Sequence, residues 1–260
     1  MKKTLTLLVS GSLLLGFGSA IADQHEEGES SVGPATPLEL WACKYNDGKG
    51  PADLDAVAAK WNAWADDQGF EDYGAWTLVP YYAGPDQDFD VLWLGGSASA
   101  QALGKAQDTW LAKGGKVMDA FNELWNCDAH ANYAVLRYKQ PPERENPANV
   151  VISFSDCNLS EGTAYDDFSA SLSEWGKYRE EHGSTSGMWV FMPAYGGGGE
   201  EFDFKVVAAW QNLEDQGTDY DQYSKEGWKK ARELFTGKAS CDSSRVYLAT
   251  NRRMTSGDDD

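Results

Sequence analysis

The chain has 260 residues and carries 41 acidic side chains against 22 lysines and arginines, a formal net charge of −19 at pH 7. This surplus of negative charge disfavours nucleic acids and anionic lipid surfaces as partners, because their phosphates would be repelled. Aromatic residues make up 13% of the chain and include 11 tryptophans, which is enough for a large packed core.

Residues 1–22 predict a bacterial secretory signal peptide. Two lysines precede the apolar run Leu5–Phe17, and an A-x-A cleavage site ends at Ala22. The mature chain is then expected to begin at Asp23, to be periplasmic or secreted, and not to insert into a membrane. A retained signal anchor is the alternative, and the shortness of the run disfavours it. The polar, acidic residues 23–37 predict a disordered leader.

Residues 38–139 alternate between strand and helix patterns. Apolar residues at every second position predict strands, and apolar residues at helical spacing predict helices. The pair Gly114 and Gly115 predicts a break in the second helix. In chain order the expected elements are a strand over Leu38–Lys44, a helix from Pro51 to near Gly69, strands over Tyr73–Tyr82 and Phe89–Gly95, a helix over Ala100–Trp125 and a strand over Ala131–Lys139.

Residues 150–253 repeat this order after a proline-containing linker at 140–149. A short acidic tail at 254–260 ends the chain. The expected elements are a strand over Val150–Cys157, a helix over Tyr165–Tyr178, strands over Gly187–Tyr195 and Phe202–Trp210, a helix over Tyr220–Phe235 and a strand over Ser244–Arg253.

Four cysteines support the internal repeat. Cys127 follows Cys43 by 84 residues, and Cys241 follows Cys157 by the same interval. Each copy has the order β-α-β-β-α-β of a ferredoxin-like unit, in which the last strand lies beside the first. We therefore expect an α+β fold of two tandem repeats, with antiparallel sheets, helices outside and one disulfide per repeat, Cys43–Cys127 and Cys157–Cys241. A metal site is disfavoured because no C-x-x-C pair is present.

Two such units in tandem resemble the dimeric α/β-barrel superfamily in a single-chain, duplicated form. The likeness spans residues 38–253 and rests on element order and on the repeat, not on a catalytic signature. It implies two associated sheets with a cavity between them, in a monomer that is a pseudo-dimer. Superfamily members include haem-degrading and quinol-type monooxygenases, isomerases and haem peroxidases. The strings LWACKYNDGKG, FDVLWLGG and CDAH are also similar to uncharacterised exported proteins of marine bacteria.

Strand alternation predicts that this cavity is partly polar. One face of the third strand carries Asp90 in the first copy, and Asp203 with Lys205 in the second. The cysteine-bearing face of the first strand carries Glu39 and Trp41. If these faces line the cavity, Asp90 or Asp203 is a candidate general base. Glu39, Trp41 and Lys205 are then expected to contact the ligand. The alternative role of either aspartate is an ion pair or a bond to a turn.

Four further aromatic residues are candidates for stacking on a ligand, and core packing is their alternative role. They lie on strands or at strand ends: Trp76, Tyr82, Trp189 and Tyr195.

His130 is a third candidate catalytic residue, and its counterpart in the second copy is Ser244. A surface or capping role is the alternative. No metal site and no cofactor are predicted, although haem is left open through His130 or His182. The expected partner is a small planar, apolar or cationic ligand, and whether the protein is an enzyme stays open. The alternatives are a barrel-type oxidoreductase or isomerase, and an envelope module that binds proteins through exposed strand edges.

Overall fold

A computed structural model describes residues 32–85, 87–142 and 148–255. The predicted signal peptide and most of the leader, part of the linker and the end of the acidic tail lie outside the described residues. The first strand begins at Thr36, inside the stretch predicted as leader.

The first half contains four strands and three helices in the predicted order. Gly115 has a positive φ of 41°, and it lets the chain turn where one long helix was expected to break. The elements are β1 (Thr36–Tyr45), α1 (Pro51–Asp67), β2 (Tyr73–Tyr82), β3 (Val91–Ser97), α2 (Ala100–Lys113), α3 (Gly115–Leu124) and β4 (Trp125–Lys139).

The second half follows the same order with two differences: its last strand is interrupted, and its second helical region contains a π-helical segment. The elements are β5 (Asn149–Leu159), α4 (Tyr165–Glu181), β6 (Gly187–Tyr195), β7 (Phe204–Trp210), α5 (Leu213–Gln222), η1 (Tyr223–Gly227), α6 (Trp228–Phe235), β8 (Ala239–Cys241) and β9 (Arg245–Arg253).

The helix predicted over Tyr220–Phe235 therefore starts earlier than expected, at Leu213. Asn212 caps it, because its side chain accepts a hydrogen bond from the backbone N–H of Asp215 at 2.8 Å. The first turn is acidic and the segment has few apolar residues, which is why the helix was not predicted before Tyr220.

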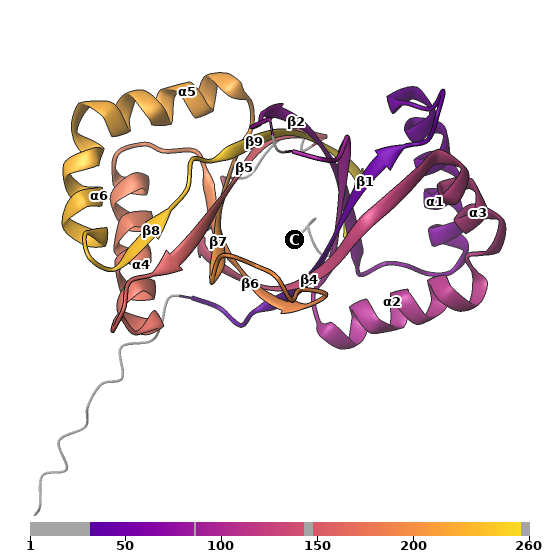
Figure 1. The fold of residues 1–260 in the computed structure, drawn as a ribbon, viewed down its shortest axis with the longest axis horizontal. Coiled ribbons are helices and arrows are strands. Elements are labelled where there is room, and N and C mark those ends of the chain that lie inside the picture. Colours follow the sequence, from indigo (N-terminus) through magenta and orange to yellow (C-terminus); the bar gives the residue numbers. More distant parts are fainter. Residues whose placement is uncertain (1–31, 86, 143–147, 256–260) are drawn as a thin grey trace, which may run out of the picture. The chain divides into compact units, whose positions relative to one another are not determined.

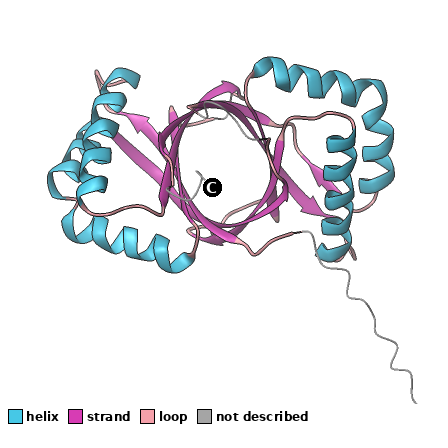
Figure 2. Ribbon diagram, turned by 180° about the vertical axis from the view of Figure 1, so that it is seen from behind, coloured by secondary structure: helices cyan, strands magenta, loops and turns pink. Residues whose placement is uncertain are grey.

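The strands form one antiparallel sheet that closes on itself as a barrel. Their order is β7-β6-β4-β1-β3-β2-β9-β5, and β5 also pairs with β7. Two seams, β4–β6 and β2–β9, join the first half to the second. The helices lie outside the barrel, those of each half against their own strands (Figures 1 and 2). Every described barrel strand has a partner on both sides, so the edges available to another protein are reduced to the short β8.

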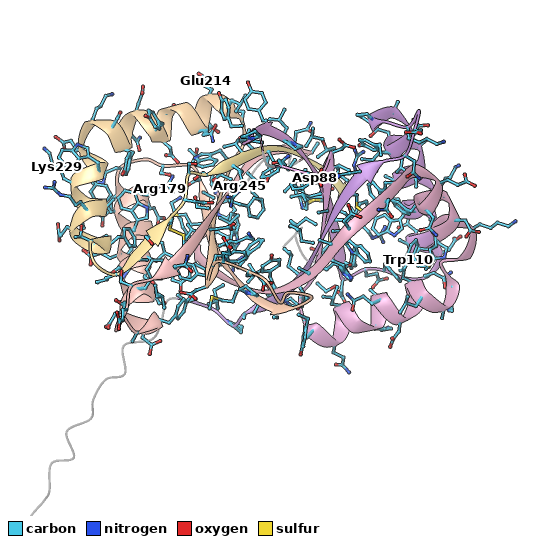
Figure 3. The ribbon with its side chains drawn as sticks, viewed as in Figure 1. Asp88, Trp110, Arg179, Glu214, Lys229 and Arg245 are labelled. Atoms are coloured by element: carbon cyan, nitrogen blue, oxygen red, sulfur yellow. A yellow bond between two sulfur atoms is a disulfide. The ribbon has the colours of Figure 1, made fainter. Side chains whose placement is uncertain are left out.

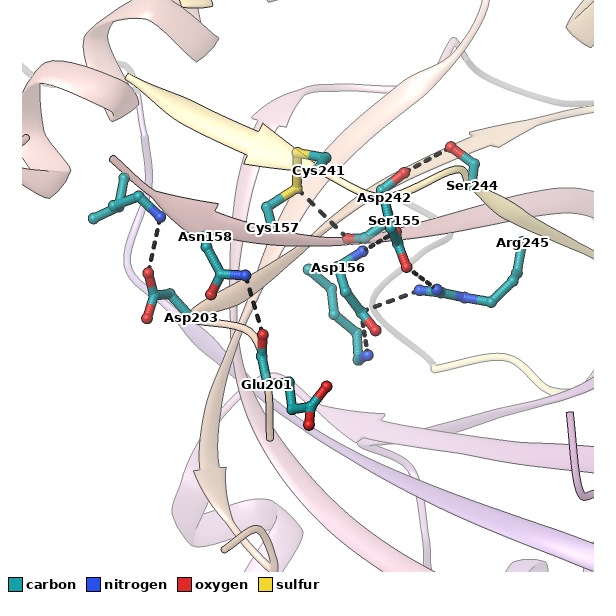
Figure 4. Close-up of a disulfide and its surroundings, with 12 residues drawn as sticks. Ser155, Asp156, Cys157, Asn158, Glu201, Asp203, Cys241, Asp242, Ser244 and Arg245 are labelled. Atoms are coloured by element: carbon teal, nitrogen blue, oxygen red, sulfur yellow. Dashed lines mark hydrogen bonds and ion pairs between the residues drawn. A yellow bond between two sulfur atoms is a disulfide. The ribbon is translucent and has the colours of Figure 1, made fainter. Parts of the chain in front are cut away.

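Both predicted disulfides are present. Cys43 lies opposite Cys127 in the β1–β4 ladder, and Cys157 lies opposite Cys241 in the β5–β8 ladder. Each bridge thus joins the end of the first strand of a half to the start of its last strand, as the predicted topology requires. Figure 4 shows the second of them.

The two faces of the sheet bury different sets of side chains. Outside the barrel, α1, α2 and α3 cover a cluster that includes Cys43, Val91 and Trp93, and the helices of the second half cover another. Inside, apolar strand residues from both halves pack together: Leu78, Leu92, Leu94, Tyr133, Val135, Val150, Ile152, Phe154, Phe191, Val207, Ala209, Tyr247 and Ala249. The cysteine-bearing face therefore looks towards the helices, which corrects the prediction that it lines a space between the repeats.

A bulge in β4 sets the direction of His130. The register with β1 shifts at Cys43, so that Asp128 is an extra residue in β4. An extra residue reverses the alternation of side chains, and Cys127 and His130 therefore both face the helices although three positions separate them. The strand predicted from Ala131 starts earlier, at Trp125. Its first residues were not predicted as strand because this polar segment lacks apolar alternation.

Candidate ligand-binding site

Glu39 on β1 is a buried carboxylate with four hydrogen-bond donors around it. Tyr73 Oη donates to its Oε1 at 2.6 Å, and Gln107 Nε2 donates to its Oε2 at 3.0 Å. The indole N–H of Trp41 lies 3.3 Å from Oε2, and Nε2 of His130 lies 2.8 Å from the same oxygen. The Glu39 side chain is only 8% exposed, so these donors replace water as its solvation.

The environment keeps Glu39 ionised. Burial alone would raise the pKa of this carboxyl, but the hydrogen bonds from His130, Tyr73 and Gln107 outweigh it and hold the pKa below the ordinary value of 4.5. Burial, and then the neighbouring Glu39 charge, raise the pKa of Tyr73 well above its usual range. Tyr73 therefore stays protonated as the donor of the pair.

The Glu39 carboxylate also determines which nitrogen of His130 carries a proton. An ionised carboxylate can only accept, so Nε2 of His130 must donate to it. In the neutral ring Nδ1 is then the acceptor, and no residue of the described ranges hydrogen-bonds to it. The ring stacks on Trp41 across the β1–β4 ladder, with centroids 3.5 Å apart and planes inclined by 13°. Glu39 and Trp41 thus fix the position of an imidazole whose Nδ1 is available to a ligand.

Gly95 on β3 leaves the space in which this cluster forms. It lies opposite Glu39 in the β1–β3 ladder. A Cβ atom at Gly95 would overlap the Tyr73 hydroxyl and approach Glu39 Oε1 to 3.3 Å. A glycine inside a strand often marks such a close approach, and here it lets Tyr73 reach Glu39.

A cavity of about 590 Å³, here named the first cavity, lies between the helices of the first half and the outer face of the barrel. Trp110 of α2 lies on its helical side (Figure 3). Glu39, Asn126 and His130 are its polar side chains on the sheet, Gln107 and Asn122 those on the helices. The walls are mostly aromatic and apolar: Trp41, Trp61, Phe70, Tyr73, Trp93, Ala106, Trp110, Leu111, Met118, Phe121, Trp125 and Cys127, with Asn126 at one side.

Of the predicted site residues, the structure brings Glu39, Trp41 and His130 together. Tyr73, Gln107 and Trp93 also belong to the site and were not predicted; the indole N–H of Trp93 donates to Tyr73 Oη at 3.2 Å. The available signal was the Gly95–Gly96 pair within an otherwise apolar strand.

Asp90 and Asp203 lie elsewhere, at equivalent strand ends. The Asp90 carboxylate accepts from the backbone N–H of Tyr45, and that of Asp203 accepts from Leu159, each at 2.8 Å. Both aspartates are exposed and neither lines the first cavity. Their geometry matches the alternative role of a bond to the backbone at a turn.

The remaining predicted contacts are also outside the first cavity. Trp76 and Trp189 pack against the cluster inside the barrel, while the side chains of Tyr82 and Tyr195 are exposed. Lys205 forms an ion pair with Asp156 and lies over the ring of Phe202, 3.8 Å from its centroid. Burial lowers the pKa of Lys205.

Asp156 also pairs with Arg245, at 3.1 Å (Figure 4). The lysine predicted to contact a ligand is therefore part of an ion-pair cluster beside the second disulfide.

The second half has a cavity in the corresponding place, here named the second cavity, of about 1200 Å³. Ser153 takes the position of Glu39, since it lies opposite Ala208 on β7 as Glu39 lies opposite Gly95. Ser244, the counterpart of His130, lines it as well. Within residues 32–85, 87–142 and 148–255, no group of three acidic, cysteine or histidine side chains is placed to hold a metal ion.

No family model and no curated protein matches the chain. Among solved structures it is similar to a candidate monooxygenase from Fusobacterium nucleatum, with TM-score 0.55, 8% identity and coverage of 85% of this chain and 94% of that one. For a candidate monooxygenase from Lactobacillus acidophilus the TM-score is 0.53 and the identity 8%, with coverage of 86% of this chain and 97% of that one. For a haem-binding protein from Thermus thermophilus the TM-score is 0.48 and the identity 9%, with coverage of 85% of this chain and 92% of that one.

The chain shares the α/β-barrel fold of the two candidate monooxygenases. At identities this low the likeness shows the fold alone, and the activity of the neighbours does not follow from it. Among the helices that the structure describes, none is both long and apolar enough to cross a membrane.

Proposed function

We propose that the first cavity binds a small, planar, mostly apolar molecule that carries a hydroxyl group. The Glu39–His130 hydrogen bond is the observation that supports this most directly. It orients His130 with Nδ1 as an acceptor, in a cavity whose other walls are largely aromatic. A hydroxyl on the ligand would donate to Nδ1.

The aromatic walls favour a flat ligand. Trp61 meets Trp93 edge to face with centroids 4.9 Å apart, and Trp110 meets Phe121 in the same way at 6.0 Å. Rings locked in this manner form a slot of fixed shape. A cationic ligand is less well supported, because the donors around Glu39 already satisfy its charge.

Isothermal titration calorimetry with 2-naphthol and with 2-methoxynaphthalene tests this proposal, because only the first can donate a hydroxyl proton. We expect the wild type to prefer 2-naphthol, and His130→Phe to lower that affinity about tenfold while retaining a ring stacked on Trp41. His182→Phe, which changes a histidine outside the first cavity, is the matched control. Equal affinity for both probes in the wild type would rule the hydroxyl contact out.

An enzyme that removes a proton is the second candidate function, because the same pair of residues suits it. His130 would accept the hydroxyl proton at Nδ1, and the ionised Glu39 would stabilise the imidazolium that forms. An isomerase would return the proton to another atom of the ligand. An oxidoreductase of the monooxygenase kind would additionally need dioxygen as oxidant.

Oxygen uptake with 1,4-dihydroxynaphthalene distinguishes binding from oxidation. Uptake above the background rate that is lost in His130→Phe and retained in His182→Phe would support the oxidoreductase. A rate equal to the background would leave ligand binding as the function.

Haem fits the first cavity poorly. No lysine or arginine of the described chain lines it to neutralise two propionates, and Glu39 adds a negative charge. An absorption spectrum of protein from its native host tests this directly, since bound haem would give an intense visible band.

We further propose that the protein is exported and folds as a monomer built from two ferredoxin-like copies. Two disulfides with the same separation of 84 residues support both parts, because disulfides persist in oxidising compartments. The strand order within each half supports the duplication: β4-β1-β3-β2 in the first, and β8/β9-β5-β7-β6 in the second. The export signal is tested by the N-terminal sequence of the mature protein.

A further inference from the structure

The second cavity differs from the first in size and in chemistry. It is about twice as large, about 1200 Å³ against 590 Å³, and it lies under α4, α5 and η1. Hydroxyl groups of Ser153 and Ser244 take the places of the Glu39 carboxylate and the His130 imidazole. The second cavity therefore lacks the titratable pair on which the proposed function rests, and it must recognise something else.

A row of stacked rings runs along α4 into this cavity. Trp175 and Tyr178 stack with centroids 5.4 Å apart and planes at 12°, and Tyr178 stacks on His182 at 3.9 Å. Their spacing along the helix puts all three on one face. Tyr220 and Tyr223 lie across the cavity on α5 and η1, with 70% and 45% of their surfaces exposed. Exposed aromatic residues gathered around a cavity indicate a binding surface.

The charged groups of the second cavity largely cancel. Asp219 is buried and forms an ion pair with Arg179, and Ser184 Oγ donates to the same carboxylate oxygen at 3.0 Å. Figure 3 shows Arg179 between the helices and the barrel. Buried ions in such a pair are committed to each other and are not free to bind a charged ligand. Asp221 and Glu226, with Lys225, leave no positive surplus for an anion.

The backbone of η1 contributes to the shape of this cavity. It is a π-helical segment between α5 and α6, and short π-helical segments are often found at functional sites. Gly227 lies against Trp175, since a Cβ there would be 3.5 Å from the end of the indole ring. The wider turn keeps Tyr223 beside Trp175, with ring planes at 87°.

We infer that the second cavity binds a neutral saccharide of two or more sugar units. Sugar rings present C–H faces that stack on tyrosine and tryptophan, and hydroxyls that pair with serine, glutamine and carboxylate side chains. The size, the row of rings and the balanced charge all fit such a ligand. A planar apolar ligand would cover the side chains of Ser153 and Gln216 without pairing with them, and the cost of burying unpaired polar groups disfavours it.

Isothermal titration calorimetry of the mature protein with cellohexaose, laminarihexaose, maltohexaose and chitohexaose tests the inference. We expect at least one to bind with a dissociation constant of about 1 mM or tighter. Tyr220→Ala should weaken that binding about tenfold, because it removes an exposed stacking surface without opening the core. Tyr195→Ala, which removes a tyrosine that is 79% exposed and lines neither cavity, is the matched control and should bind as the wild type does.

His130→Phe should leave saccharide binding unchanged, which separates this site from the proposed function of the first cavity. Absence of binding by all four hexasaccharides would overturn the inference. So would loss of binding in His130→Phe with full binding in Tyr220→Ala, or tighter binding of the anionic hexagalacturonic acid than of every neutral sugar.

Discussion

The two cavities occupy corresponding positions in the two halves of one barrel, yet the polar side chains at corresponding strand positions differ. In the first, Glu39, Tyr73 and His130 form a tight cluster made possible by Gly95. In the second, two serines stand in place of the acid and the histidine, and the glycine is replaced by Ala208. The strands, disulfides and helix order are shared, so the backbone supplies a position and three or four side chains supply the chemistry. Equivalent substitutions in the two halves therefore separate what the fold requires from what each cavity does.

The largest expected loss of stability follows removal of a disulfide, and it should be the same in both halves. Replacing Cys43 and Cys127 by serine, or Cys157 and Cys241, should each lower the free energy of unfolding by about 4.5 kcal/mol, because both bridges close loops of the same length. Urea denaturation of the two double variants measures this. Only the first pair should also weaken 2-naphthol binding, since Cys127 lines the first cavity. A large difference in stability between the pairs would show that native contacts, and not loop length, decide their contribution.

Glu39→Ala should destabilise the protein by about 3 kcal/mol, because it removes the acceptor of the buried Tyr73 hydroxyl. Ser153→Ala, the matched change in the second half, should cost no more than about 1 kcal/mol. Thermal and urea denaturation of both variants make the comparison. Equal losses would mean that the carboxylate contributes nothing beyond the volume of its side chain.

The pH dependence of stability isolates the charge of Glu39. Its pKa is lower in the folded protein than the ordinary value of 4.5, so the unfolded chain binds more protons between the two values. The stabilisation is complete above about pH 4.5 and disappears as the pH falls through the folded pKa. Glu39→Gln should reduce the slope of unfolding free energy against pH in that acid range, and an unchanged slope would contradict the assignment.

A smaller loss is expected from Gly95→Ala, about 1 to 3 kcal/mol, because the new methyl group would overlap the Tyr73 hydroxyl. Ala208→Gly is the matched change and should cost about 1 kcal/mol or less. Tyr73→Phe in the Gly95→Ala background should recover part of the loss. If the double variant is no more stable than Gly95→Ala alone, the overlap is relieved in another way.

The smallest effect should again be equal in the two halves. Asp90→Ala and Asp203→Ala each remove one carboxylate acceptor of a backbone N–H at the surface, worth about 1 kcal/mol. Neither should change the binding of 2-naphthol. A loss of ligand affinity without loss of stability in either variant would restore that aspartate as a site residue.

Much of the fold could be predicted, because cysteine spacing and strand order constrain each other. Cys43 ends a first strand and Cys127 begins a last one, and only neighbouring strands allow the bridge. The face on which the cavity lies could not be predicted in the same way. The apolar face of β3 with Val91 and Trp93 was correctly expected to face the helices, but a single sequence does not show which face of β1 lies on the same side, and the pairing of Cys43 with Val91 places the cysteine-bearing face there.

The candidate site was predicted in part for a related reason. Glu39 and Trp41 were identified on the cysteine-bearing face of the first strand and His130 as an unrepeated histidine, whereas Tyr73, which donates to Glu39, has an ordinary strand pattern. The bulge at Asp128 has no sequence signature, although it decides that His130 faces Glu39. Side-chain direction after a bulge depends on pairing with another strand, which a single sequence does not contain.

Both halves of the barrel belong to one polypeptide, and this affects how their cavities can change by mutation. A barrel assembled from two identical polypeptides carries every substitution twice, so an acid gained in one cavity appears in the other. Joining both halves in one open reading frame removes this coupling, and each codon can then change independently. A symmetric homodimer could not carry Glu39 in one cavity and Ser153 in the corresponding position of the other, whereas a single chain can.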